Sequence, residues 1–108
     1  MRLGPFAFPI RPEDVRQFRK ATGLVADGPV PLAFLARFFT EPEVLAALTS
    51  HYGAKVPIHV AQSFRLFSTP MPGALSGLVK IKADRVTARL CDSTGADVAE
   101  LVGEFAFR

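Results

Sequence analysis

Residues 29–39, Pro-Val-Pro-Leu-Ala-Phe-Leu-Ala-Arg-Phe-Phe, form the longest apolar stretch of the chain. From Pro31 to Phe39 the pattern predicts a central helix that is apolar on nearly every side, and such a helix must be covered by other protein. The stretch carries Arg37 and is much shorter than the roughly 20 residues of a membrane-spanning helix, so we expect no membrane partner. The rest of the fold is therefore expected to form around this helix.

Immediately after the central helix, Thr40-Glu-Pro-Glu43 has the spacing of a capping box, with Thr40 as N-cap. This motif predicts that the helix bends or restarts there and does not continue straight. Its buried side would then continue through Val44, Leu45, Leu48 and Tyr52, and Gly53 would end it.

From Pro57 onward the hydrophobic period changes to two, which is typical of strands with one buried side. We expect a long strand at 57–67, followed by strands at 75–82, 85–90 and 99–107 that are separated by turn residues. Their polar sides carry basic residues on two strands and Glu100 and Glu104 on the last, so cross-strand charge pairs are expected.

On the N-terminal side, alternating apolar residues at 6–10 predict a short strand, and Pro12 opens an amphipathic helix that ends at Gly23. Val15, Phe18 and Ala21 mark its buried side. The predicted order is strand, helix, buried helix and then three or more antiparallel strands. We therefore predict one α+β domain over residues 1–108, a curved antiparallel sheet wrapped around a long hydrophobic central helix.

Composition excludes several classes of protein. The 108 residues are 49% hydrophobic, and the net charge of +3 comes from scattered basic residues, so a nucleic-acid partner is not expected. The lone Cys91 and the two histidines cannot form a disulfide or a common zinc site, and we expect no metal and no cofactor. No apolar leader precedes Pro9 and Arg11, so a cytoplasmic location is expected.

Five stretches in order carry a family resemblance: residues 8–23, Gly28-Pro-Val-Pro-Leu-Ala-Phe34, His59-Val-Ala-Gln-Ser-Phe64, Pro70-Met-Pro-Gly73 and Gly95-Ala-Asp-Val-Ala-Glu100. Together they resemble the MaoC-like hydratases and dehydratases of the hotdog superfamily, and most of all the N-terminal, non-catalytic half of double-hotdog members. The resemblance implies a single hotdog domain and chemistry on enoyl or 3-hydroxyacyl thioesters of coenzyme A or acyl carrier protein, as in fatty acid metabolism.

The resemblance also implies a catalytic pair, an Asp followed five positions later by a His, and a backbone N–H at the start of the central helix that polarises the thioester carbonyl. Neither histidine fits, because Ala46 and Ala54 stand five positions before His51 and His59. Pro29 and Pro31 have no N–H, which leaves Gly28 and Val30 as donors.

We therefore favour a subunit without its own acid and base, which forms a homodimer or pairs with a catalytic hotdog chain. Candidate ligand contacts are Gly28, Val30, Phe34 and His59. One alternative is an autonomous hydratase or acyl-CoA thioesterase that uses an unconventional acid such as Asp27, with His59 as a second catalytic candidate. The other is a binding protein for acyl ligands that has no catalytic activity. Arg37 is expected to reach a dimer seam more readily than a coenzyme A phosphate.

Overall fold

The structure is a computed structural model that describes residues 2–53 and 57–107, with the backbone alone described for residues 57–60, 106 and 107. The chain forms, in order, β1 (Arg2–Ile10), α1 (Pro12–Ala21), α2 (Leu32–Leu35), the 3₁₀ helix η1 (Ala36–Thr40), α3 (Pro42–Tyr52), β2 (Pro57–Leu66), β3 (Gly73–Lys82), β4 (Arg85–Cys91) and β5 (Asp97–Phe107). No helix in these two ranges combines the length and the apolar character needed to cross a bilayer.

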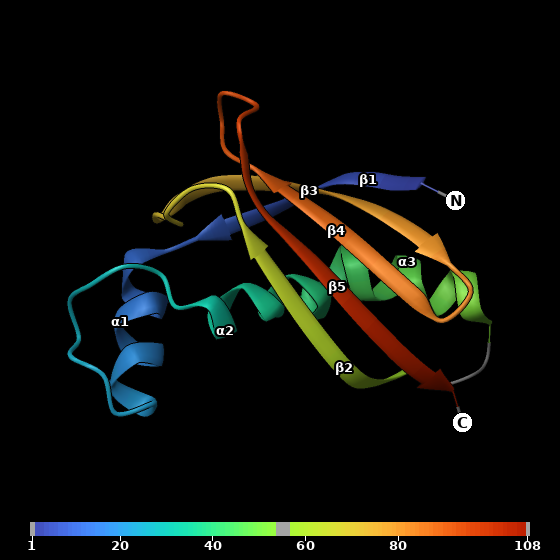
Figure 1. Cartoon of the computed structure of the whole chain (residues 1–108), viewed down its shortest axis with the longest axis horizontal. Helices are drawn as coiled ribbons and strands as arrows, with labels where there is room; N and C mark the ends of the chain where they lie inside the picture. The colour runs from blue at the N-terminus through green and yellow to red at the C-terminus, as the bar shows by residue number, and fades with distance from the viewer. Residues whose placement is uncertain (1, 54–56, 108) are drawn as a thin grey trace.

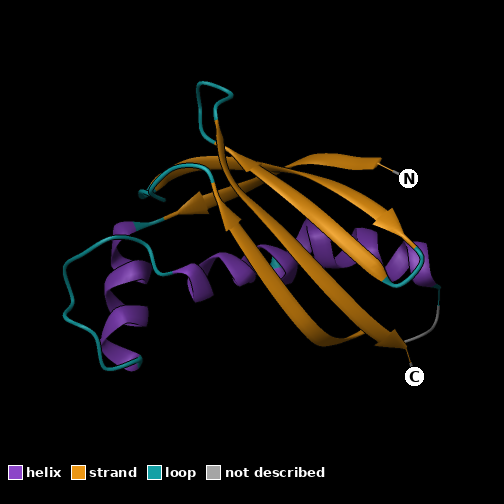
Figure 2. Ribbon diagram, viewed as in Figure 1, coloured by secondary structure: helices purple, strands orange, loops and turns teal. Residues whose placement is uncertain are grey.

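The sheet has the strand order β1-β3-β4-β5-β2, and every neighbouring pair is antiparallel. Short turns join β3 to β4 and β4 to β5. The chain between β1 and β2 instead crosses from one edge of the sheet to the other through all the helices, as Figure 1 shows. The strands curve over α2, η1 and α3, which lie end to end against one face of the sheet (Figure 2). The predicted α+β architecture of a sheet around a central helix is confirmed.

The central helix consists of three consecutive segments, α2, η1 and α3. The break comes where the sequence predicts it, but the predicted capping box is wrong. The Thr40 hydroxyl donates a hydrogen bond back to the Arg37 carbonyl at 2.8 Å, and Glu41 takes the N-cap position without a side-chain cap. Pro42, the first residue of α3, has no N–H to be capped and already has the backbone angle of a helix.

Aromatic rings fill the space between the central helix and the sheet. Phe38 is fully buried and meets the edges of Phe8 and Phe39 at centroid distances of 5.6 and 5.8 Å, and Phe39 meets Phe105 at 6.0 Å. Phe38 also lies directly over Gly77 of β3, where any Cβ atom would stand 2.4 Å from the ring. The absence of a side chain at Gly77 is what lets η1 approach the sheet so closely.

The sheet covers only one side of the helical layer. Leu32 and Leu45 are 43% and 45% exposed, and Ala21 of α1 is exposed as well, so the expectation that Leu45 and Ala21 are buried is wrong. Hydrophobic periodicity identifies the apolar positions of a helix, but one sheet cannot contact a helix all the way round. The central helix therefore has an apolar side that this chain leaves uncovered.

Candidate functional site at the start of the central helix

The Arg19 side chain of α1 holds two carbonyls of the loop between α1 and α2, residues 22–31. Arg19 donates from Nε to the Val25 carbonyl at 2.6 Å and from Nη1 to the Pro29 carbonyl at 3.0 Å. Gly28 passes over the same guanidinium, and a Cβ atom at this position would lie 2.5 Å from it. The glycine and the arginine together fix the path of the chain into α2.

Asp27 projects from this loop into solvent. Its side chain is 84% exposed and forms an ion pair with Arg16 of α1, with Nε and Oδ1 3.5 Å apart. Water screens such a surface pair strongly, so it adds little to stability. Leu32, 43% exposed, stands five positions further on, where the resemblance would require a histidine.

Val30 and Phe34 point into the core. They are 4% and 3% exposed, and the ring of Phe34 meets the edge of Phe18 at 5.5 Å. The guanidinium of Arg37 lies over both rings, 4.6 Å from the Phe34 centroid and 5.2 Å from that of Phe18. Arg37 is exposed, and cation–π contacts with the faces of these two rings stabilise its positive charge. Of the predicted contacts in this region, Gly28 alone is exposed.

The histidines lie far from this loop. His51 is exposed in the last turn of α3, its ring 4.8 Å from that of Tyr52, and Figure 1 shows this end of α3 at the opposite end of the helical layer from α1 and its loop. His59 is the third residue of β2 and pairs with Phe105, and its side chain lies outside the described part of the structure. The structure thus brings neither His51 nor the backbone of His59 to Asp27.

Gln62 of β2 is a polar residue that the sequence analysis did not single out. Both polar atoms of its side-chain amide are buried, and neither has a hydrogen-bond partner among the described residues. It alternates in phase with Phe64, which packs against the core, and so faces the helical layer. The sequence feature that could have identified it is a glutamine at one of the alternate positions of β2 that otherwise carry apolar residues. A buried amide of this kind requires a polar partner from elsewhere, such as water, a ligand or another chain.

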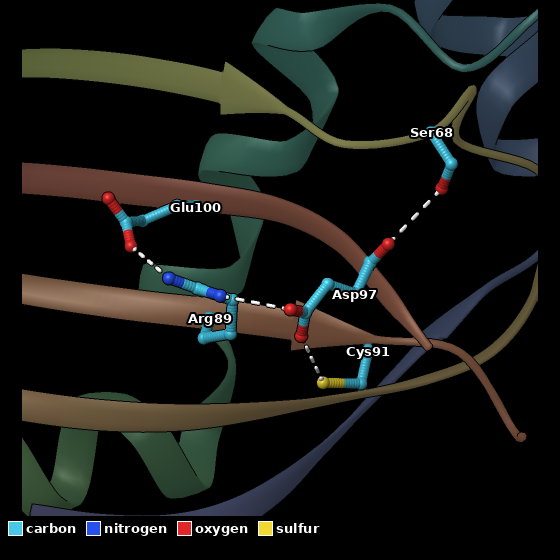
Figure 3. Close-up of polar contacts among 5 residues, drawn as sticks. All are labelled: Ser68, Arg89, Cys91, Asp97 and Glu100. Carbon is cyan, nitrogen blue, oxygen red and sulfur yellow. Dashed lines mark hydrogen bonds and ion pairs between the residues drawn. The ribbon is translucent and has the colours of Figure 1, made fainter. Parts of the chain in front are cut away.

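On the outer face of the sheet, a polar cluster joins β4 to β5 (Figure 3). Arg89 donates to Glu100 at 2.7 Å and to Asp97 at 3.0 Å, and the Cys91 thiol lies 3.5 Å from Asp97. Burial, reinforced by the bond to Asp97, raises the pKa of the Cys91 thiol, which makes it a poor nucleophile. Together with the Arg85–Glu104 pair at 3.0 Å, the cluster confirms the predicted cross-strand charge pairs.

Comparisons with known proteins show the fold. No protein-family model matches the sequence, and no curated protein matches it. The structure is similar to a chain of the C-terminally truncated HadBC (3R)-hydroxyacyl-ACP dehydratase complex from Mycobacterium tuberculosis, with a TM-score of 0.80 and 17% identity over 98% of this chain and 95% of that one. It is also similar to unliganded R-hydratase PhaJ1 from Pseudomonas aeruginosa, with a TM-score of 0.55 and 19% identity over 97% of this chain and 78% of that one. The chain has the hotdog fold.

Proposed function

We propose that this chain is a MaoC-like hotdog subunit that lacks its own acid and base and assists a catalytic hotdog chain in the hydration or dehydration of acyl thioesters. The observation that carries the proposal is the entrance to the central helix. Its only carboxylate, Asp27, is solvated and paired with Arg16, and Leu32 stands where an imidazole would be needed. General acid–base catalysis needs a group within hydrogen-bond reach of the proton that moves.

The backbone at this entrance supports the same conclusion. Pro29 and Pro31 have no N–H, and the helix that begins there, α2, has only four residues before it tightens into η1. So short a helix offers few aligned peptide dipoles to stabilise negative charge on a thioester oxygen. Val30 and Phe34 contribute apolar packing, which suits the wall of an acyl site better than a reaction centre.

Partnership with a second hotdog chain has support of its own. The HadBC neighbour is a complex of two kinds of chain, and it matches this chain over nearly the full length of both. Here β1 and β2 are sheet edges, and the outward side of the central helix exposes Leu32 and Leu45. Pairing with another chain would cover such edges and apolar positions. It could also supply a partner for the Gln62 amide, which has none among the described residues.

Hydration of crotonyl-CoA tests the proposal. The purified chain alone is expected to leave the enoyl thioester unchanged. Added to a hotdog hydratase from the same host that carries the Asp and His pair, it should form a complex that size-exclusion chromatography with light scattering detects, and it should change the rate or chain-length preference of the hydratase. Gln62→Leu removes the amide that a partner chain would pair with and should weaken the complex. Lys20→Gln on α1, a surface change, is the control and should leave the complex intact.

The autonomous enzyme is the outcome that contradicts this proposal. The chain alone would then turn over crotonyl-CoA or release free thiol from an acyl-CoA. Loss of this activity in Asp27→Asn or His59→Ala would establish the chain as an autonomous enzyme. A stable monomer that binds no hotdog chain at micromolar concentration would contradict the partnership. Stabilisation by acyl-CoA without turnover and without a partner would favour a simple acyl-binding protein.

A further inference from the structure

The outer face of the sheet places basic residues directly opposite one another. Arg2 of β1 pairs with Lys80 of β3, and Lys82 of β3 pairs with Arg85 of β4. Lys80 and Lys82 are alternate residues of one strand and therefore share a face. Like charges directly opposite each other destabilise a sheet, so the fold is less stable for having these two pairs side by side.

Most of this charge is uncompensated within the described chain. Arg85 pairs with Glu104, but Arg2, Lys80 and Lys82 form no ion pair with any carboxylate that the structure describes. Asp84, in the turn between β3 and β4, is the other nearby acid in the sequence. On the β4–β5 side of the same face, by contrast, basic and acidic residues are matched. The imbalance is therefore local to one corner of the sheet.

This corner is also hollowed. A groove of about 350 Å³ is lined by Arg2, Lys80, Ile81, Lys82, Arg85 and Thr87. An adjoining groove of about 300 Å³ shares Arg2, Lys80 and Thr87, and it adds the half-exposed Leu78 and the paired Arg89 and Glu100. Grooves of this size are on the scale of small-molecule sites. A flat basic surface would suit an acidic protein better than this concave one does.

We infer that this corner, formed by Arg2, Lys80, Lys82, Arg85 and Thr87, binds a ligand that carries several phosphate charges. Lysine ammonium groups bind phosphate as point charges, and arginine forks bind two of its oxygens at once. The Thr87 hydroxyl adds a neutral donor. A bound polyanion would remove the repulsion within both like-charge pairs. The phosphates could belong to coenzyme A or to a free nucleotide, and the inference does not depend on the proposed function.

Isothermal titration calorimetry at physiological ionic strength tests the site with pyrophosphate, ADP, coenzyme A and adenosine as probes. Phosphorylated probes should bind and adenosine should not. Lys80→Gln/Lys82→Gln should weaken binding about tenfold, since two charge-assisted contacts are lost. Lys20→Gln, an exposed lysine of α1, should leave it unchanged. Binding of all three phosphorylated probes would indicate general polyphosphate recognition, and binding of coenzyme A alone would identify it as the source.

Thermal unfolding of the ligand-free protein gives a second, independent readout. Because the two lysines repel their neighbours, Lys80→Gln/Lys82→Gln should raise the melting temperature by roughly a few degrees. The stabilisation that pyrophosphate gives to the unaltered protein should be smaller in this variant, because the variant binds about tenfold more weakly. The inference is overturned if no phosphorylated probe binds, if the double variant binds as well as the unaltered protein, or if an acidic peptide such as polyglutamate binds and the phosphorylated probes do not. None of these results depends on thioester turnover.

Discussion

Replacing Gly77 with alanine should destabilise the protein, although alanine is no worse a strand former than glycine. The added methyl group would lie 2.4 Å from Cε1 and Cζ of Phe38 and 3.0 Å from a methyl group of Leu90. Ordinary van der Waals contact begins near 3.4 Å, so the ring must retreat by about 1 Å. It has little room to do so, because Phe38 is fully buried between Phe8 and Phe39.

The magnitude follows from overpacking. Inserting one methyl group into a filled core costs about 1–3 kcal/mol. A domain of about this size has a free energy of unfolding of about 5–15 kcal/mol, so the loss is a substantial share. At about 4–8 °C per kcal/mol, the melting temperature should fall by roughly 5–20 °C. The higher strand preference of alanine opposes this effect by less than about 1 kcal/mol.

Thermal and urea unfolding, followed by circular dichroism, measure the loss. Ser76→Ala, one position earlier in β3 and only partly buried, is the control and should change stability little. Phe38→Leu should destabilise by itself, but the double variant Gly77→Ala/Phe38→Leu should lose less than the sum of the two single losses, because the smaller side chain makes room for the methyl group. Stability of Gly77→Ala equal to or above that of the unaltered protein, or strict additivity with Phe38→Leu, would refute the argument.

Three further predictions concern the loop, the thiol and the buried amide. Gly28→Ala should displace the Arg19 guanidinium, release the two carbonyls it holds and increase proteolysis of the loop between α1 and α2. Val25→Ala, which shortens a 76% exposed side chain of the same loop and leaves its carbonyl in place, is the control and should change proteolysis little. Burial raises the pKa of Cys91 in the folded state, so less thiolate forms there than in the unfolded chain, and stability should fall as the pH rises through the thiol range. Alkylation of Cys91 at pH 8 should also be slower than that of a free thiol, and Asp97→Asn should accelerate it. Gln62→Leu should stabilise the isolated chain by about 1 kcal/mol in thermal unfolding, because it removes a buried amide that has no partner among the described residues. An equal or lower stability would show that the amide is hydrogen-bonded in solution.

Local patterns predicted the elements and most of the buried sides. Local sequence shows which side of an element is buried against its neighbours. The period of two after Pro57 and the apolar stretch at 31–39 could therefore be interpreted from sequence. The identity of the N-cap could not be predicted in this way, because the Thr40 hydroxyl can donate back to the Arg37 carbonyl and need not cap the next helix. Exposure of Leu45 also escaped prediction, because it depends on how far round the helix the sheet extends.

The candidate site was predictable only where chemistry depends on residue type. The absence of a histidine five positions after Asp27 is a property of the sequence alone. The Arg19 contacts with the loop, the ion pair of Asp27 and the burial of the Gln62 amide depend on which elements meet in space. The like-charge pairs of Arg2 with Lys80 and of Lys82 with Arg85 depend on strand register, which no single strand specifies.

The crossover from β1 to β2 has a consequence for synthesis. β2 precedes β3, β4 and β5 in the chain, yet its neighbour in the described sheet is β5, the last of the five strands to be made. On the ribosome, β2 must therefore wait without a partner while the three later strands emerge, with both its edges open to any other extended chain. Nascent chains that stall before Asp97 should be the species that chaperones retain.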